Sequence, residues 1–377
     1  MMAALILTFT MGSIHAFSVL LTAIEQIYAA SRAQAGLSYS IALVCLTATV
    51  LLGPRIYQLA RPAQLAAAAC LLASCGLIIA AFAPSLPLFW LGYGVIFGGA
   101  NGIAYGFALL LAARAYPNRR GLAMGTATAA YALGAALFAP IFETLLINQS
   151  LQTCLITLAG TLIMAGAASF KLLSSSNLET SATTHINATL QNRHLAHLWL
   201  AYGLSVAAGL MAIGHAAGIM AAKLTNPDDA ASTAFIGAIG IAVGNAIGGI
   251  LAGALADRLK PNKLLASLTT IAAAAIAALI VTQNALAMLL ALASIGFAYG
   301  AYIAAFPPVI ANLAGIDRYP AIYGRIFTAW GTFGLLAPWL AGFTFDLTGN
   351  YQTALIIALT AALMATVLNL RLPAKLQ

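Results

Sequence analysis

The stretch Met11-Gly12-Ser13-Ile14-His15-Ala16 returns 200 residues later as Met211-Ala212-Ile213-Gly214-His215-Ala216. Each copy lies inside an apolar run that has no charged residue for several positions on either side. A motif repeated at just over half the length of a 377-residue chain indicates two related halves. Transporters built from such repeats bind their substrate near the middle of the membrane, where the repeats meet. The two histidines are therefore the first candidates for a shared site.

Composition places the whole chain in a membrane. Hydrophobic residues make up 62% of the chain and charged residues 6%, whereas an average soluble domain has roughly 25% charged residues. Lipid offers the backbone no hydrogen-bond partner, and the apolar runs are longer than strands, so we expect helices. The first run has no basic segment before it, which favours a span over a cleaved signal peptide.

We predict twelve spans of ~20 or more mainly apolar residues, enough for a hydrocarbon core of ~30 Å. Their expected ranges are 3–29, 36–60, 63–83, 87–114, 120–147, 151–172, 196–223, 231–256, 262–282, 285–314, 320–346 and 351–371. The expected fold is an all-α polytopic membrane protein with two pseudo-symmetric six-helix bundles. Residues 1–172 form the first bundle and 195–377 the second, joined by a cytoplasmic linker at 173–194, which is rich in Ser, Thr and Asn.

The distribution of charge predicts the orientation. With both termini in the cytoplasm, fourteen of the sixteen Lys and Arg residues lie in inner loops or at inner helix ends, and only Arg32 and Lys223 lie outside. This positive-inside bias supports twelve spans in a cytoplasmic (inner) membrane. The net charge of +8 therefore reflects topology and not a nucleic-acid-binding surface. The four cysteines lie in apolar runs without metal-ligand spacing, so we expect no metal or other cofactor.

An acidic residue closes the eighth span at its inner end, in the string Gly253-Ala254-Leu255-Ala256-Asp257-Arg258. A carboxylate at a helix C-terminus opposes the helix dipole, so Asp257 needs a compensating cation or an opposing helix N-terminus. The string resembles the inner-loop motif of the major facilitator superfamily, which implies a gating role for Asp257 and Arg258. The corresponding stretch of the first half, Gly53 to Arg61, has no acid, which predicts an asymmetric inner gate.

A second motif runs through residues 98–140. It contains Asn101-Gly102, Tyr105-Gly106, Tyr116-Pro117-Asn118-Arg119-Arg120-Gly121-Leu122-Ala123-Met124-Gly125 and Tyr131. It resembles the span 4–5 signature of the oxalate/formate antiporter and monocarboxylate-porter branch of that superfamily, which implies alternating access. We expect Arg119 and Arg120 to hold the inner turn, Arg325 to be a further gate residue, and Gly121 and Gly125 to permit close helix contact.

The resemblance also implies an arginine in span eight and a lysine in span eleven, where this chain has Gly249 and Trp330. The histidines are then the main ionisable candidates. Counted from Glu25 and Lys223, they lie about 12–15 Å deep at 1.5 Å per residue, where an ionisable group is costly to bury and indicates function. Imidazole titrates near physiological pH and can carry a coupling proton. The expected substrate-binding residues are His15, His215, Phe17, Asn101, Tyr105, Tyr131, Tyr299, Tyr302 and Trp330.

These features favour a monomeric, proton-coupled secondary transporter of a small, weakly acidic or polar organic solute. Export of neutral or amphipathic compounds, of the drug/proton antiporter type, suits an aromatic site with few charges. A non-transporting nutrient receptor is a further alternative. An enzyme is not expected, because the spans contain no carboxylate pair, metal-ligand spacing or activated nucleophile. The chain has no phosphate-binding glycine loop that would indicate use of ATP.

Overall fold

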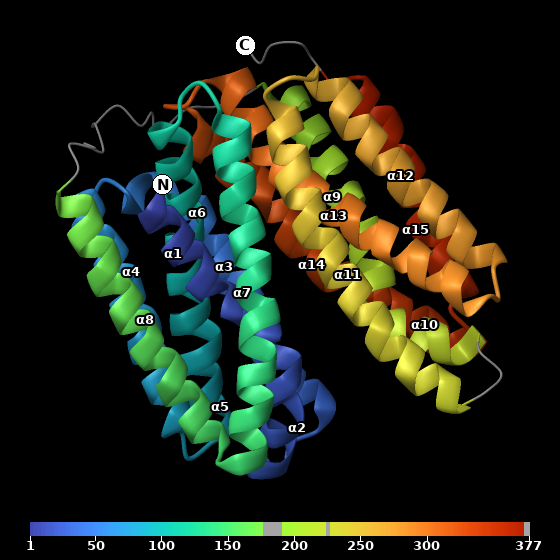
Figure 1. Cartoon of the computed structure of the whole chain (residues 1–377), viewed down its shortest axis with the longest axis horizontal. Coiled ribbons are helices and arrows are strands. Elements are labelled where there is room, and N and C mark those ends of the chain that lie inside the picture. The colour runs from blue at the N-terminus through green and yellow to red at the C-terminus, as the bar shows by residue number, and fades with distance from the viewer. Residues whose placement is uncertain (176–190, 224–226, 373–377) are drawn as a thin grey trace. The chain divides into compact units, whose positions relative to one another are not determined.

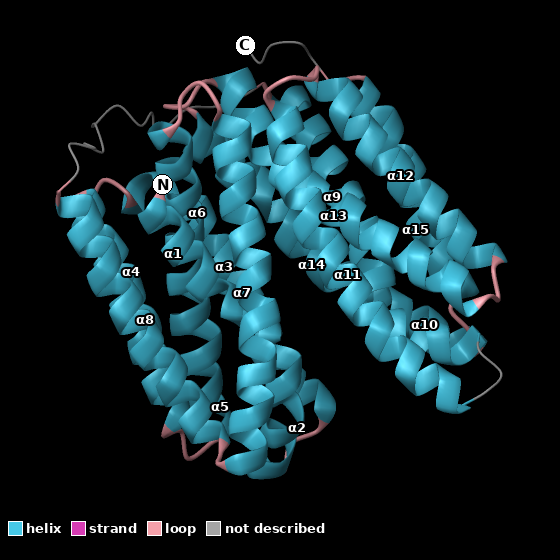
Figure 2. Cartoon of the chain, in the orientation of Figure 1, coloured by secondary structure: helices cyan, strands magenta, loops and turns pink. Residues whose placement is uncertain are grey.

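The structure is a computed structural model that describes residues 1–175, 191–223 and 227–372. Helices make up almost all of these residues, and no strand occurs among them (Figure 2). The expected all-α class is therefore confirmed. The helix boundaries agree with the predicted spans to within a few residues, because proline, glycine and polar residues end the apolar runs.

The first six predicted spans are each helical (Figure 1). They comprise α1 (Met2–Met11), η1 (Gly12–Ala16) and α2 (Phe17–Tyr28); α3 (Arg32–Ile56); α4 (Pro62–Ala81); α5 (Leu86–Phe89), η2 (Trp90–Phe97) and α6 (Gly98–Ala115); α7 (Arg120–Asn148); and α8 (Leu151–Ser174). The fourth span contains a π-helical segment, η2, where the expected span was regular. Such segments are rare and occur often near functional sites.

The second six spans follow the same order. They comprise α9 (Asn192–Gly214) and α10 (Ala216–Lys223); α11 (Pro227–Ala256); α12 (Pro261–Val281); α13 (Ala285–Ala314); α14 (Tyr319–Thr348); and α15 (Gln352–Leu370). Among the described residues, eleven helical stretches are long and apolar enough to cross a membrane. The remaining predicted span, the eighth, corresponds to α11, whose described apolar part is Gly240–Ala256.

Helix ends follow local chemistry. Ser31 and Gln34 form a capping box at the start of α3, with each side chain bonded to the other residue's backbone N–H. Pro62 and Pro261 occupy the first turns of α4 and α12, where a missing N–H costs nothing. Gly315 follows α13 with φ +84°, a conformation that side chains other than glycine rarely adopt.

Packing groups the chain into two compact units. The first contains Met1–Pro117, Ala130–Ala188 and Ile316–Gly324, and the second contains Asn118–Ala129, Thr189–Gly315 and Arg325–Gln377. The start of α7 thus belongs to the second unit, and the start of α14 to the first. The bundle boundaries expected from the sequence stay a prediction, and most of the expected linker lies outside the described residues.

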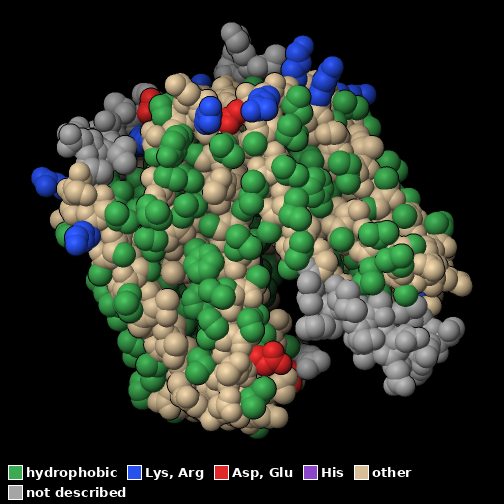
Figure 3. Space-filling model, in the orientation of Figure 1, with side chains coloured by type: hydrophobic (Ala, Val, Ile, Leu, Met, Phe, Trp, Pro, Cys, Tyr) green, Lys and Arg blue, Asp and Glu red, His purple; other side chains and the backbone are tan. Residues whose placement is uncertain are grey.

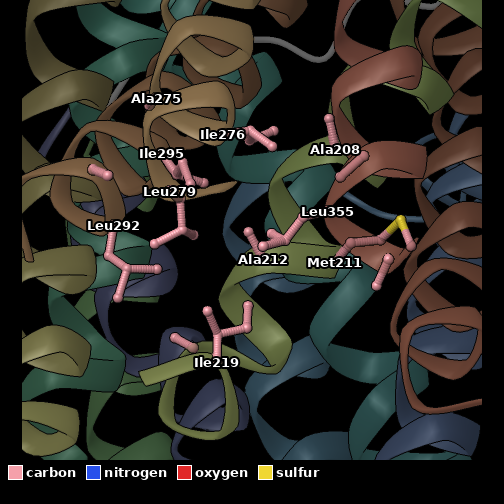
Figure 4. Close-up of a cluster of buried hydrophobic side chains, with 14 of the residues drawn as sticks. Ala208, Met211, Ala212, Ile219, Ala275, Ile276, Leu279, Leu292, Ile295 and Leu355 are labelled. Atoms are coloured by element: carbon pink, nitrogen blue, oxygen red, sulfur yellow. The ribbon is translucent and has the colours of Figure 1, made fainter. Parts of the chain in front are cut away.

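The second unit has a core of small and branched apolar side chains. Figure 4 shows this cluster, whose labelled members are Ala208, Met211 and Ala212 of α9, Ile219 of α10, Ala275, Ile276 and Leu279 of α12, Leu292 and Ile295 of α13, and Leu355 of α15. Alanines among larger residues let helix backbones approach closely, which is the main source of helix association in lipid. Large hydrophobic side chains also cover the outer flanks of the helices (Figure 3).

Both histidines of the repeated motif lie at breaks in helices that were expected to be continuous. In the first span, α1 gives way to the 3₁₀ segment η1, which contains His15. In the seventh span, α9 ends at Gly214, and His215 has φ −120° and ψ 15° before α10 begins. A change in helical hydrogen bonding leaves backbone groups that need other partners. In each half, the helix is therefore interrupted at the histidine, and backbone polar groups there need partners outside the helix.

Candidate functional site

His15 lies in a cluster of aromatic side chains within the first unit. Its Nδ1 atom is 2.5 Å from the hydroxyl oxygen of Tyr39 on α3. Tyr131 of α7 meets the imidazole edge-on, with ring centroids 5.3 Å apart. Phe17 stacks on Tyr39 at a centroid distance of 5.4 Å and an interplanar angle of 13°. At the helix break, the His15 imidazole therefore contacts one hydroxyl and lies among several aromatic rings.

Asn101 connects this cluster to the helix break. Its Nδ2 atom donates to the carbonyl of Met11, the last residue of α1, at 2.6 Å, and its Oδ1 atom accepts from the Tyr131 hydroxyl at 2.8 Å. Asn101 is fully buried, so these bonds satisfy a polar group that would otherwise be costly in the membrane interior. Tyr105 packs on Tyr131 with ring centroids 4.9 Å apart. All five candidates of the first half therefore belong to one connected group.

Tyr39 belongs to the same group but was not among the residues expected from the sequence. Its sequence context offers a signal, because Ser38, Tyr39 and Ser40 form a polar triplet inside an otherwise apolar span. Ser38 is buried and Tyr39 is half-buried. Only the packing of α3 beside the break in the first span places the Tyr39 hydroxyl on the imidazole.

His215 has different partners from His15. Its Nε2 atom is 2.8 Å from the carbonyl oxygen of Pro338, which lies inside α14. A carbonyl only accepts, so Nε2 carries a proton in this contact. The His215 ring also packs against Tyr351, with centroids 5.4 Å apart. The two imidazoles are thus equivalent in sequence position, but one contacts a hydroxyl and the other a backbone carbonyl.

The remaining candidates of the second half divide into two groups. The Trp330 indole N–H donates to the Tyr299 hydroxyl at 3.2 Å, and Phe327 stacks on Trp330 at 5.2 Å with an angle of 11°. Tyr302 instead packs on Tyr202 and donates to Asn369 Oδ1 at 3.1 Å, with 2% of its surface exposed. Tyr299 and Trp330 therefore form an aromatic pair, whereas Tyr302 belongs to a buried polar contact.

The C-terminal end of α11 shows how Asp257 is satisfied. Asp257 Oδ1 accepts from the backbone N–H of Gly121 at 2.7 Å, and Oδ2 accepts from that of Leu122 at 2.9 Å. Both donors lie in the first turn of α7, where N–H groups lack partners within the helix and the helix dipole favours an anion. Of the two partners expected for this carboxylate, the structure supplies the helix N-terminus. All three residues belong to the second unit.

Close glycine packing supports this contact. A Cβ atom added to Gly125 would lie 2.6 Å from Gly253 Cα and 3.0 Å from the Gly249 carbonyl oxygen. A Cβ added to Gly253 would lie 2.7 Å from both the Gly121 carbonyl oxygen and Gly125 Cα. The small-residue face expected for Gly121 and Gly125 therefore meets a matching face on α11, and no side chain fits between them at these points.

The first unit contains an ion pair of its own at a helix end. The Gly53–Arg61 stretch has no acid, but Asp317, which precedes α14, lies 3.8 Å from Arg114 at the end of α6. Arg119 and Arg258 are exposed, and Arg120 and Arg325 are half-buried. The expected gate arginines thus lie near helix ends, and the two N–H groups bonded to Asp257 belong to Gly121 and Leu122 of α7.

The sequence pattern of the Major Facilitator Superfamily matches residues 1–261 of this chain, well over half its length. The chain belongs to the Major Facilitator Superfamily. Its all-α architecture and its apolar helices agree with this assignment. The resemblance to this superfamily that the sequence motifs indicated is thus confirmed. Members of the superfamily that match the chain are transporters.

Three proteins illustrate the similarity at the level of sequence and fold. The chain is 24% identical to the uncharacterized MFS-type transporter YhjX of Escherichia coli (strain K12), covering 88% of this chain and 84% of YhjX. It is 25% identical to monocarboxylate transporter 13 of Rattus norvegicus, over 76% and 68% of the two chains. The outward-conformation crystal structure of the superfamily transporter FucP has a TM-score of 0.75 at 17% identity, covering 97% of each chain.

Proposed function

We propose that this superfamily member is a proton-coupled secondary transporter of small monocarboxylates, working by alternating access. We further propose that it acts as a monomer in the cytoplasmic membrane, with both termini in the cytoplasm. The observation that carries the proposal is the position of His15, a titratable side chain at a helix break, bonded to a hydroxyl and surrounded by aromatic rings. An ionisable group within a span is a functional candidate by default, because its burial is costly.

The partners of the two histidines favour His15 as the coupling residue. Tyr39 can donate to a neutral imidazole and accept from a charged one, so the contact survives a change of charge. His215 donates to a backbone carbonyl in either charge state, which suits a brace between the α9–α10 break and α14. We therefore assign proton coupling to His15 and a positioning role to His215.

The proposed substrate class rests on the relatives and on the aromatic pair. Several matching proteins are monocarboxylate transporters by name. Tyr299 has a hydroxyl, Trp330 has an indole N–H, and both have apolar ring faces. They can therefore contact the apolar part of a small acid and offer a hydrogen bond. Within the first unit, we assign attraction of a carboxylate to protonated His15, because this chain has Gly249 and Trp330 where the resemblance implies cations.

Proteoliposome uptake of radiolabelled pyruvate and L-lactate tests this function. We expect uptake to rise severalfold when the outside is more acidic than the lumen, since a coupled proton adds its gradient to the driving force. His15→Gln should lose the dependence on the proton gradient and also transport more slowly, because it loses the charge that attracts the carboxylate. His215→Gln should keep the dependence at a reduced rate. His15→Ala combined with His215→Ala should abolish pH-dependent uptake in a folded protein. Unchanged uptake between about pH 5 and about pH 8 would contradict proton coupling.

A second function, export of neutral or amphipathic compounds, is favoured by the stacked pair of Phe327 and Trp330. Flat aromatic surface with few charges suits such solutes. A thermal-shift screen on purified protein separates the two functions. Stabilisation by lipophilic compounds, with none by mono- or dicarboxylates, would favour the exporter. Stabilisation by monocarboxylates alone would favour the first proposal.

A further inference from the structure

We propose that Tyr39 is the positioning residue that holds the His15 ring and relays a proton to its Nδ1 atom. This inference rests on the proposed function in one respect, because it takes His15 as the coupling residue. The contact itself is a property of the first unit and is testable without any substrate. It adds a residue that neither the sequence motifs nor the family resemblance supplies.

The geometry places the Tyr39 hydroxyl directly at the His15 ring. The distance between Tyr39 Oη and His15 Nδ1 is 2.5 Å, which is within hydrogen-bonding distance. The Tyr39 ring stacks on Phe17, and Phe17 also packs on Tyr93 of the π-helical segment at 5.3 Å. Rotation of the Tyr39 ring would disturb its stack on Phe17, so this packing holds the hydroxyl at the imidazole.

The chemistry of the two groups gives a balanced proton transfer. When His15 is neutral, the Tyr39 O–H donates to Nδ1, and the ring proton is on Nε2. When a proton binds to Tyr39 Oη, the original hydroxyl proton moves to Nδ1. Tyr39 is then again a neutral hydroxyl, His15 is an imidazolium, and Nδ1–H donates to Oη. One proton enters, one positive charge appears on the ring, and Tyr39 is unchanged.

Titratable side chains occur on the elements around His15. The break is flanked by α1 and α2, Tyr39 comes from α3, and Tyr131 comes from α7. Tyr131 also meets the His15 ring, and its own hydroxyl donates to Asn101. The charged residues of these helices lie near helix ends; they are Glu25, Arg32, Arg55, Arg120 and Glu143. Tyr39 has its hydroxyl at Nδ1 and is thus placed to control the proton on that atom.

Nitrogen NMR of the full-length protein, labelled with ¹⁵N-histidine in lipid nanodiscs, tests the contact. The His15 resonances are those that vanish in His15→Gln. In the wild type we expect the Nδ1 resonance of neutral His15 to show a strong accepted hydrogen bond. In Tyr39→Phe this resonance should move to the position of an unbonded imine nitrogen. Tyr28→Phe is the matched control, because the Tyr28 hydroxyl bonds the Ala83 carbonyl, away from His15, and should leave the His15 signals in place.

A transport measurement on the same variants tests the relay. Tyr39→Phe should lower proton-driven pyruvate uptake on the order of tenfold or more, while exchange of labelled for unlabelled pyruvate at equal pH continues. His15 signals that are identical in Tyr39→Phe and wild type would overturn the proposal, as would moved signals with unaltered proton-driven uptake. If the wild type moves no pyruvate or lactate, the substrate assignment fails, and the NMR result still decides whether Tyr39 positions His15.

Discussion

At the scale of the residue, local chemistry decides what each polar side chain does in the membrane. Asn101 uses both ends of its amide, one on the carbonyl of Met11 and one on Tyr131. Lys223, one of the two cations predicted to lie outside the inner loops, donates to the carbonyls of Leu279, Ile280 and Thr282, at the C-terminal end of α12. A cation at a helix C-terminus is favourable because it satisfies orphan carbonyls and complements the dipole.

Asp257→Ala is the test at this scale. The carboxylate accepts two N–H groups that α7 cannot satisfy itself, and removal of a capping side chain costs about 0.5–2 kcal/mol. We expect a lower midpoint of thermal unfolding in detergent, with a smaller decrease for Asp257→Asn, which keeps one acceptor oxygen. Asp346→Ala, which removes an exposed acid from α14, is the control. Equal midpoints for Asp257→Ala and the control would show that the two bonds contribute nothing.

At the scale of the element, the backbone contact of α7 with α11 depends on glycine at particular positions. Gly121 and Gly125 on one helix meet Gly253 on the other, so that backbone atoms touch. Gly249, one turn earlier on α11, has more room, since an added Cβ would make ordinary contacts at 3.6 Å with Ala129 and 3.7 Å with Ala304. The two positions look alike in sequence and differ only in the space beside them.

This difference predicts opposite effects of one substitution. Replacing glycine by alanine in a helix gains about 1 kcal/mol of intrinsic propensity at either position, whereas overpacking costs about 1–3 kcal/mol. Gly253→Ala is expected to lower the thermal midpoint, because its Cβ would lie 2.7 Å from backbone atoms of α7. Gly249→Ala should leave the midpoint unchanged or raise it. A lower midpoint for Gly249→Ala than for Gly253→Ala would contradict the observed packing.

At the scale of the whole molecule, composition and charge place the chain in the bilayer. Lys and Arg gather at helix ends, and hydrophobic side chains cover the helix flanks (Figure 3). The free energy of keeping cations on the cytoplasmic side sets the orientation independently of the substrate. The proposed topology, with both termini inside, is therefore testable without knowledge of transport.

Reporter fusions in a bacterial host check the orientation. A fluorescent protein after residue 117, in a predicted inner loop, or at the C-terminus should fluoresce, because it folds in the cytoplasm. Alkaline phosphatase after residue 84, in a predicted outer loop, should be active, because its disulfides form outside. Active phosphatase at the C-terminus would reverse the topology. Active phosphatase after both 84 and 117 would show that the fourth span does not cross.

The sequence by itself determined the class, the spans and the family. Apolar runs of membrane length and charges confined to loops are local properties, so they can be read without any tertiary contact. The repeated histidine motif, the Asp257 loop and the Gly121–Gly125 face were visible for the same reason. The sequence also named five residues of the His15 cluster, because polar and aromatic residues are conspicuous in apolar spans.

The tertiary structure decided which of these residues meet. It broke the first and seventh spans at the histidines, gave His15 a hydroxyl and His215 a carbonyl, and brought Tyr39 to Nδ1. It also separated Tyr302 from the Tyr299–Trp330 pair and supplied Asp257 with two backbone donors at the start of α7. The physical reason is that a side chain's partners depend on the rotation and depth of neighbouring helices. Packing of the whole fold sets both quantities, and neither is encoded at the position of the residue itself.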